Sequence, residues 1–304
     1  MDIAIMIEGQ AGLNWPRWKR VVRTVEELGF AGLYRSDHFT NASPPDIDSL
    51  ELWVSLTWLA DNTKRIEFGP LVAPFSFRHP AHTARMAGAV DDLSAGRLSL
   101  GLGAGWQARE HEKFGFELLD IDPRFQRFEE GLEVVTRLLR SDEPFSFSGN
   151  FYRLNDAVLL PRPERKNGPP VLIGGNGEKR TLPLVARYAG EWNANFITAE
   201  EVRRLNGILD NLLREAGRRP GEVRRSLMTG CVFGESEAKV REASKVYGER
   251  PIEALRKAGF IVGTSAQVSE QLAGLAETGI DRVMLQWLDL DNLDGLEALA
   301  NAVL

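Results

Sequence analysis

Short apolar runs recur along the chain, and most are followed by a stretch in which apolar residues have helical spacing. We predict eight strands from these runs, at residues 3–7, 31–34, 66–70, 97–102, 171–173, 191–194, 226–233 and 282–287. The strand Val171-Leu172-Ile173 is apolar throughout, which is typical of a parallel strand buried on both faces. Helices are predicted between the strands at 15–28, 50–62, 80–93, 124–139, 179–188 and 199–216. This alternation predicts an α/β fold with a parallel sheet.

The predicted parallel sheet can close into a barrel or remain open with two edges. Eight strand–helix units favour a single (β/α)8 TIM barrel over residues 1–304, because such barrels often exceed about 250 residues as one domain. A doubly wound open sheet is the alternative, but it leaves two edge strands, and none of the predicted strands is polar enough for an edge. Residues 142–170 break the rhythm with aromatic residues around Ser148-Gly149-Asn150, which predicts an inserted β-hairpin.

The composition argues against nucleic acid and membranes as binding partners. The formal net charge is −6, so the chain offers no excess of positive charge for nucleic acid or for an anionic membrane. No apolar stretch has the length of a membrane span, and the first residues lack the basic region of a signal peptide. We therefore expect a cytoplasmic protein that acts on a small molecule. Cys231 is the single cysteine, which excludes an intramolecular disulfide and a cysteine-based metal cluster.

Two small-residue loops follow predicted strands. The loop Gly174-Gly175-Asn176-Gly177 lies between a strand and a helix, where backbone N–H groups and the helix N-terminus suit a phosphate. A plain turn that needs glycine conformations explains this loop equally well. The loop Gly103-Ala104-Gly105-Trp106 lacks the third glycine of a dinucleotide fingerprint, since Trp106 stands there. It predicts only that backbone can approach a ligand closely.

Histidine is the residue type best suited to proton transfer near neutral pH. Asp37-His38 follows the strand at 31–34, at the end of the barrel where catalytic residues gather. For a lone Asp-His pair a surface loop is the commoner explanation. The other histidines, His79, His82 and His111, show no metal-binding spacing, so no metal site is expected.

Four features then occur in a recognisable order: Asp37-His38, the stretch 69–74, the stretch 96–105, and Gly174-Gly175. Together they resemble the luciferase-like flavin and deazaflavin oxidoreductases, most closely the bacterial branch that uses the deazaflavin coenzyme F-420. The similarity covers essentially the whole chain. It implies a β/α barrel that holds the ring of the cofactor in its mouth, against a non-proline cis peptide near Leu71-Val72. The loops at 103–106 and 174–177 would then hold the ribityl chain and the phosphate.

The resemblance also implies an activity, which is hydride transfer between the deazaflavin and a small organic substrate. His38 is the implied acid or base, and Asp37 its orienter or a partner of the cofactor ring. Deazaflavin-dependent sugar-phosphate and alcohol dehydrogenases of this kind carry a catalytic glutamate where Trp106 stands, which disfavours those substrates. Glu110 and His111, one turn later, are candidate replacements for that acid.

Two other functions remain open on the same fold. An FMN-dependent monooxygenase would need oxygen at the ring and a separate reductase as partner. A barrel that only binds or carries flavin would not need Asp37-His38 at the rim. A homodimer is the other partnership we consider. If F-420 is the cofactor, its carboxylate tail needs basic residues near the rim, and four candidates are Arg78, Arg109, Lys179 and Arg180.

Overall fold

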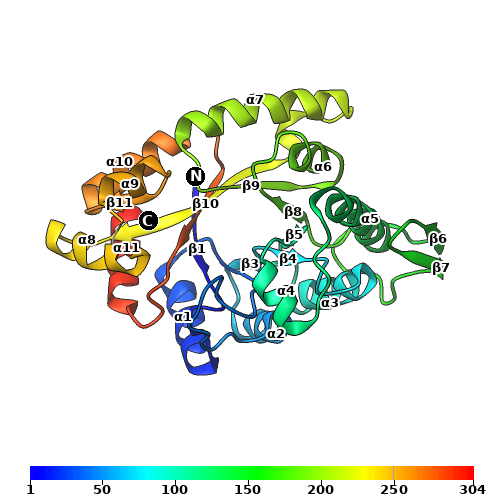
Figure 1. Ribbon diagram of the computed structural model, residues 1–304, viewed down its shortest axis with the longest axis horizontal. Coiled ribbons are helices and arrows are strands. Elements are labelled where there is room, and N and C mark those ends of the chain that lie inside the picture. Colours follow the sequence, from blue (N-terminus) through cyan, green and yellow to red (C-terminus); the bar gives the residue numbers. More distant parts are fainter. Residues whose placement is uncertain (249) are drawn as a thin grey trace.

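A closed barrel of parallel strands forms the centre of the computed structural model, which describes residues 1–248 and 250–304 (Figure 1). The strand order around the barrel is β3-β2-β1-β12-β10-β9-β8-β5-β4, and all of these pairings are parallel. Their bounds are β1 (Asp2–Ile7), β2 (Gly32–Arg35), β3 (Glu67–Pro70), β4 (Ala73–Pro74), β5 (Leu100–Gly103), β8 (Val171–Gly174), β9 (Glu191–Asn195), β10 (Arg224–Phe233) and β12 (Arg282–Gln286). The predicted barrel is thereby confirmed.

The barrel closes at an irregular strand. β3 and β4 are two halves of one barrel strand, interrupted at the cis peptide bond between Leu71 and Val72, near which the resemblance implied such a bond. The first half meets the segment before β5 through an isolated parallel bridge between Phe68 and Leu98, and the second half pairs Ala73 with Leu102 of β5. Leu71 and Val72 therefore interrupt the regular sheet at the open end of the barrel.

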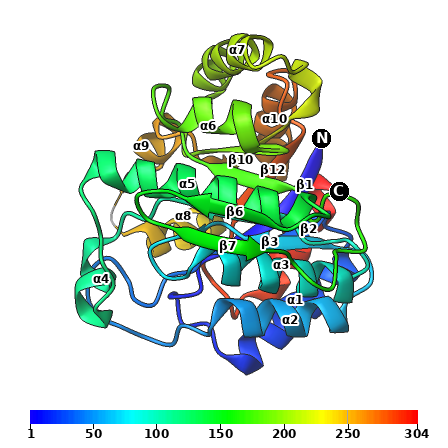
Figure 2. The ribbon, with the colours of Figure 1, turned by 90° about the vertical axis from the view of Figure 1, so that its right-hand side faces the viewer.

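Helices surround the strands because each has one apolar face that packs on the outside of the barrel (Figures 1 and 2). Asn14 caps α1 at its N-terminus, and Thr198 with Glu201 forms a capping box at α7. The ring comprises α1 (Trp15–Leu28), α2 (Leu52–Asn62), α3 (Pro80–Leu93), α5 (Ile121–Arg140), α6 (Thr181–Tyr188), α7 (Ala199–Glu215), α10 (Ser265–Ala276) and α11 (Leu293–Val303). Within the described residues, no helix is long and apolar enough to cross a membrane.

The inside of the barrel is apolar toward the open end and charged toward the other. An inner cluster is formed by Ala4, Met6, Tyr34, Leu71, Leu172, Met228 and Met284. At the N-terminal ends of the strands, the buried Arg282 bonds Glu67 at 2.7 Å and lies 3.8 Å from Glu191. This buried ion cluster fills the lower end of the barrel, so a ligand reaches the interior from the upper rim.

Three elements lie outside the regular barrel. The predicted hairpin is present as β6 (Phe145–Ser148) and β7 (Arg153–Ala157), and it projects beside α5 (Figure 1). Glu130 of α5 accepts from the N–H of Asn150 at 2.7 Å, which holds the hairpin turn against this helix. The sequence did not indicate β11 (Ile261–Gly263), which pairs with the end of β10. With α8 (Glu237–Ser244) and α9 (Ile252–Lys257) it encloses a small separate apolar cluster.

Candidate active site at the open end of the barrel

The chemistry-bearing residues gather where the parallel strands end. β2 leads directly to Asp37 and His38, β5 leads to the loop at 103–107, and β8 leads to the loop at 174–177. The short helix α4 (Ala108–Phe114) follows the β5 loop and reaches back toward β2. Because carboxyl ends of parallel strands share one rim, residues far apart in sequence meet here.

His38 and Glu110 form a hydrogen-bonded pair at this rim. His38 Nδ1 lies 2.8 Å from Glu110 Oε1, and Glu110 Oε2 accepts from the backbone N–H of Phe39 at 3.0 Å. The Glu110 side chain is only 2% exposed, whereas that of His38 is 19% exposed. An ionised carboxylate only accepts hydrogen bonds, so Nδ1 is the donor. This leaves His38 Nε2, which has no protein partner among the described residues, for a ligand at the rim.

The environment of His38 makes it a stronger base than a free imidazole. Burial lowers its pKa, but the hydrogen bond and the charge of Glu110 together raise the pKa by more. The net result is a pKa above the ordinary value, so protonation of His38 is favoured in the folded protein.

We expect Glu110→Gln to lower the pKa of His38, because the carboxylate that most strongly opposes the effect of burial is then removed. The imidazole proton shifts of the four histidines, followed by NMR across pH, measure this change. A raised folded-state pKa stabilises the protein below the unfolded pKa, and that contribution is lost as pH rises through the folded value. The variant should therefore lose most stability on the acidic side, whereas Glu112→Gln, an exposed neighbour, should change neither quantity. An unchanged His38 titration in the Glu110 variant would contradict this account.

Asp37 does not orient His38, which was one of the two roles expected of it. Its carboxylate is held by Arg78, which also bonds Glu51 at 3.0 Å. Among the described residues Asp37 makes no hydrogen bond to His38, so Glu110 orients His38 and Asp37 does not. Burial raises the pKa of Asp37, and the Arg78 guanidinium offsets part of that rise. The Asp37–Arg78 pair fixes the loop that carries His38.

Both ring nitrogens of His111 are hydrogen-bonded within the protein, so this residue has a structural role. Its Nδ1 lies 2.7 Å from the carbonyl oxygen of Gln107, and its Nε2 lies 2.8 Å from Ser76 Oγ. Since a carbonyl only accepts, Nδ1 carries the proton and Nε2 accepts from the serine. His111 is buried and ties α4 to the loop after β4. Of the two candidate replacements for a catalytic acid, Glu110 alone reaches His38.

Trp106 lies on the outer side of His38. The two rings meet edge to face with centroids 5.5 Å apart, and Trp106 is 64% exposed. A large exposed aromatic residue beside a reactive histidine can cover an apolar substrate. Trp106 therefore presents an apolar surface, and no acid, beside His38.

Leu71 and Val72, the interruption between β3 and β4, form what we call the Leu71–Val72 bulge. The side chain of Val72 packs closely against the backbone of β5 and β8. A Cβ atom on Gly103 would lie only 2.5 Å from Cγ2 of Val72, and Val72 also comes within 3.3 Å of the Cβ position of Gly174. Glycines at 103 and 174 thus make room for the Val72 side chain. Leu71 and Val72 join the inner apolar cluster, which forms a floor on which a flat ring can lie.

The loop at 174–177 keeps its backbone open. Gly175 has φ +125°, a conformation that residues with a side chain rarely adopt, and it lies at the rim before α6. The Asn176 side chain bonds the backbone of Asn195, at 2.8 Å to its carbonyl oxygen and 3.0 Å from its N–H. These bonds brace the loop against β9 and occupy the side-chain amide of Asn176, which is therefore not available to a ligand.

A cavity of about 500 Å³ opens at this rim; we call it the mouth cavity. Its lining comes mainly from the segments that follow β1 and β9, from the end of β12 and from the segment before β11. The lining residues include Glu8, Asn41, Phe196, Tyr247, Phe260 and Gln286, whereas His38 and the loop at 174–177 are not among them. The sequence analysis missed all six. Phe196 and Tyr247 both pack on Phe260, with centroids 5.3 and 5.0 Å apart, so one wall is aromatic.

Comparison with protein families identifies the chain. The family model described as luciferase-like monooxygenase matches residues 3–252. The protein belongs to the luciferase-like family. It is therefore an oxidoreductase of that family, as the order of its motifs indicated.

Relatives of this luciferase-like protein include F420-dependent dehydrogenases and a monooxygenase. It is 30% identical over 286 residues to an F420-dependent glucose-6-phosphate dehydrogenase of Amycolatopsis mediterranei, covering 90% of this chain and 80% of that one. It is 31% identical to the 4-hydroxyprotoasukamycin monooxygenase of Streptomyces nodosus, over 60% of this chain and 47% of that one. Among solved structures, an F420-dependent secondary alcohol dehydrogenase in complex with an F420-acetone adduct superposes with a TM-score of 0.84. That structure is 19% identical over the full length of both chains, so it shows a shared fold.

Proposed function

We propose that this protein transfers a hydride between coenzyme F-420 and a small organic substrate that binds at the open end of the barrel, next to the mouth cavity. The observation that carries the proposal is the His38–Glu110 pair, which places a proton-transfer group at the same rim as the mouth cavity. The deazaflavin ring supplies or accepts the hydride when bound. The protein itself binds, orients and moves the proton.

The residues present fit a flavin-like cofactor. The apolar floor around Leu71, Met6 and Met228 suits one face of a flat ring. The loop at 174–177 suits a phosphate at the backbone N–H groups of Asn176 and Gly177, since the N–H of Gly175 already donates to the carbonyl oxygen of Asn193 at 2.9 Å. Several of the similar relatives are named as F420-dependent, and this likeness favours F-420 over FMN.

His38 acts on the substrate hydroxyl or carbonyl oxygen. With Nδ1 held by Glu110, its Nε2 can take a proton from an alcohol or return one to a carbonyl as the hydride moves in the other direction. Glu110 stabilises the imidazolium that forms when His38 takes the proton. The pair therefore works in either direction of the reaction.

The mouth cavity favours an uncharged substrate with an apolar part. Its aromatic wall and the neighbouring Trp106 offer apolar contact, while Gln286 and Asn41 offer hydrogen bonds. Within the described residues the only basic side chain in its lining is Arg250, and Glu8 lines the same space. A sugar phosphate, with two negative charges, would find little compensation here. Trp106 disfavoured both alcohols and sugar phosphates, but Glu110 reaches His38 and replaces the acid that is absent at position 106. We therefore propose an alcohol or ketone with an apolar part, and not glucose 6-phosphate, in spite of the relatives' names.

Most of the basic residues expected to contact the carboxylate tail of F-420 already form ion pairs within the protein. Three of the four basic candidates are paired: Arg78 with Asp37, Arg109 with Asp46, and Arg180 with Asp122. Lys179 is exposed, lies next to the glycine loop, and forms no ion pair within the described residues. Lys179 is thus the residue we assign to the tail, and the dependence of binding on salt should be shallow.

We expect Gly175→Val to weaken F-420 binding by about 5- to 150-fold, or roughly 1–3 kcal/mol, the scale of a lost hydrogen bond to a charged group. The valine would occupy space at the loop and would force φ away from +125°. Fluorescence titration of the folded variant measures the loss. Gly217→Val is the matched control, because Gly217 also has positive φ but has nothing within 4 Å of its Cβ position. Equal losses in both variants would mean that backbone strain, not the phosphate, explains the effect.

A panel of primary and secondary alcohols, incubated with the protein and oxidised F-420, tests the proposed function directly. Reduction of F-420 by at least one alcohol, with no dependence on oxygen, is the expected result. Substrate oxidation that requires FMN, a reductase and oxygen would instead establish the monooxygenase.

A further inference from the structure

A loop leaves the open end of the barrel after His38 and returns to it before α2; we call its residues 39–49 the rim strap. At one end, the N–H of Phe39 donates to Glu110 at 3.0 Å. At the other end, Ser49 Oγ donates to the carbonyl oxygen of His38 at 2.5 Å. The residues between, 42–48, are exposed to solvent. A loop with so few buried contacts needs further bonds to keep one position.

One arginine of α4 joins the two halves of the rim strap. Arg109 Nη1 donates to the carbonyl oxygen of Asn41 at 2.7 Å and to Asp46 Oδ1 at 2.6 Å. Its Nη2 donates to the other Asp46 oxygen at 2.8 Å, and Lys113 of the same helix pairs with this carboxylate as well. A guanidinium that binds a carboxylate through two parallel hydrogen bonds fixes direction as well as distance. Arg109 therefore holds the rim strap on α4 in one orientation.

The rim strap and α4 each carry a residue of the proposed active site. Glu110, which holds His38, comes directly after Arg109 on α4. Asn41 lines the mouth cavity, and its side-chain N–H donates to the carbonyl oxygen of Pro45 at 2.9 Å. Because a carbonyl only accepts, this bond identifies the amide nitrogen. The Asn41 Oδ1 accepts no hydrogen bond from the described residues, so it is left for a ligand.

Two simpler roles for Arg109 fit its contacts less well. An isolated surface ion pair contributes little. Arg109 differs from such a pair, because its side chain is only 24% exposed and also bonds a backbone carbonyl of the rim strap. To contact the carboxylate tail of F-420, Arg109 would have to leave Asp46. Hydrogen bonds from Arg109 and Lys113 hold the pKa of Asp46 below its ordinary value, so this carboxylate stays charged and paired.

We propose that Arg109 is a positioning residue, which holds Asn41 and Glu110 in their working places through the rim strap. The chemistry remains that of the proposed hydride transfer, in which His38 takes or returns the proton. The kinetic consequences therefore rest on the proposed function. The effect on the His38–Glu110 pair does not, because it can be measured without substrate or cofactor.

Two substitutions with opposite changes of charge test the proposal. Arg109→Met removes a positive charge from the contact with the rim strap, and Asp46→Asn removes a negative one. If position matters, both variants loosen α4, Glu110 is held less firmly against His38 Nδ1, and the pKa of His38 falls in both. If charge alone matters, loss of the guanidinium raises that pKa. NMR titration of the histidine ring protons separates the two, and an unchanged or raised His38 pKa in Arg109→Met would overturn the proposal.

Turnover of the best alcohol of the panel gives the second readout. Arg109→Met should lower kcat/KM by about 10- to 100-fold, the scale of a lost hydrogen bond to a charged group. Asp46→Asn should lose less, because the bond to Asn41 remains, and the double variant should equal Arg109→Met. Arg109→Lys should recover part of the loss, since lysine keeps the charge but not the planar fork. Weaker F-420 binding in Arg109→Met, with an unchanged His38 titration, would assign Arg109 to the tail and reject the positioning role.

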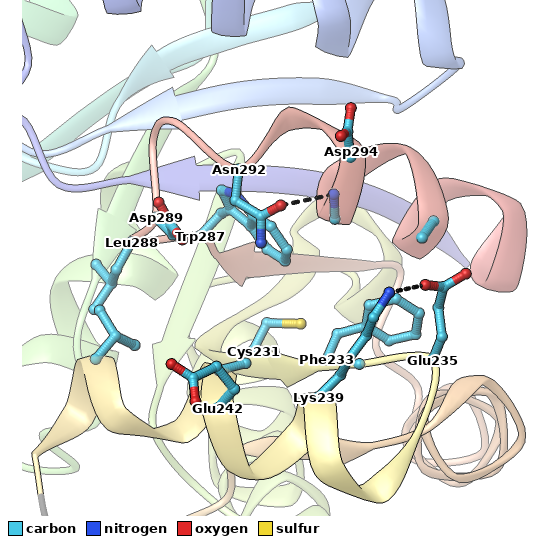
Figure 3. Close-up of a pocket in the computed structure, with 15 residues that line it drawn as sticks. Cys231, Phe233, Glu235, Lys239, Glu242, Trp287, Leu288, Asp289, Asn292 and Asp294 are labelled. Carbon is cyan, nitrogen blue, oxygen red and sulfur yellow. Dashed lines mark hydrogen bonds and ion pairs between the residues drawn. The ribbon is translucent and has the colours of Figure 1, made fainter.

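Lys239→Met is the control. It breaks the exposed Lys239–Glu235 ion pair beside a cavity between α8 and α11, which no residue of the rim strap lines (Figure 3). Its His38 titration and its turnover should equal those of the unmodified protein, and a fall as large as that of Arg109→Met would reject a specific role for Arg109. If no alcohol reduces F-420 even with the unmodified protein, the proposed function fails, and the NMR titration alone decides whether Arg109 positions Glu110.

Discussion

Replacing His38 by asparagine is expected to lower turnover by about two to four orders of magnitude, the usual contribution of a general acid or base. The variant keeps a polar side chain of similar size but cannot carry a proton near neutral pH. Affinity for F-420 should fall far less, because the residues proposed to hold the ring, Leu71 and Val72, and the loop proposed to hold the phosphate are unchanged. The rate of F-420 reduction by the best alcohol of the panel, measured in a single turnover, gives the effect on the chemical step.

The matched control is His82→Asn, which changes an exposed histidine on α3. Turnover of that variant should equal that of the unmodified protein. Turnover of Glu110→Gln should lie between those of His38→Asn and His82→Asn, because this variant keeps His38 but makes it a weaker base. If His38→Asn retains full turnover across pH, His38 only fixes α4 to β2, and the acid or base is another residue.

The second large effect concerns the closure of the barrel. We expect Gly101→Ala to lower the free energy of unfolding by more than about 4 kcal/mol, which is exceptional for a single methyl group. A Cβ atom at this position would lie 2.0 Å from the carbonyl oxygen of Pro70. That oxygen belongs to the backbone of β3 and cannot turn away as a side chain can. Urea-induced unfolding, or the loss of soluble protein on expression, measures the result.

Gly207→Ala is the control for this substitution. Gly207 is inside α7, and nothing lies within 4 Å of its Cβ position. Alanine favours a helix by about 1 kcal/mol over glycine, so this variant should be slightly more stable than the unmodified protein. Comparable stability of the two alanine variants would show that β3 and β5 can separate at no cost, contrary to the close pairing described here.

The barrel could be predicted from the sequence because its signals are local. Wholly apolar runs such as 171–173 and amphipathic stretches between them specify strand and helix without knowledge of their neighbours. The hairpin at 145–157 was marked by its turn residues. By contrast, β11 has only three residues, Ile261–Gly263, and owes its conformation to pairing with β10. No periodicity is measurable over so short a run.

The site was predictable only where the chain itself places a residue at the rim. His38 and the glycine loops follow strands, and so their position was foreseen. The partner of Asp37 was not, because Arg78 comes from another loop and either Asp37 or Glu110 could have met His38. Gly103 was assigned to the cofactor, yet its lack of a side chain is explained first by Val72. The aromatic wall of the mouth cavity is drawn from three separate segments, which no motif connects.

The central claim is that this member of the luciferase-like family uses a deazaflavin. Parallel titrations of the purified protein with F-420 and with FMN, each followed by absorbance and fluorescence, test it most directly. We predict saturable F-420 binding that is tighter than FMN binding and that weakens in Gly175→Val but not in Gly217→Val. Protein that purifies with FMN bound, or that binds FMN more tightly than F-420 at every salt concentration, would contradict the claim.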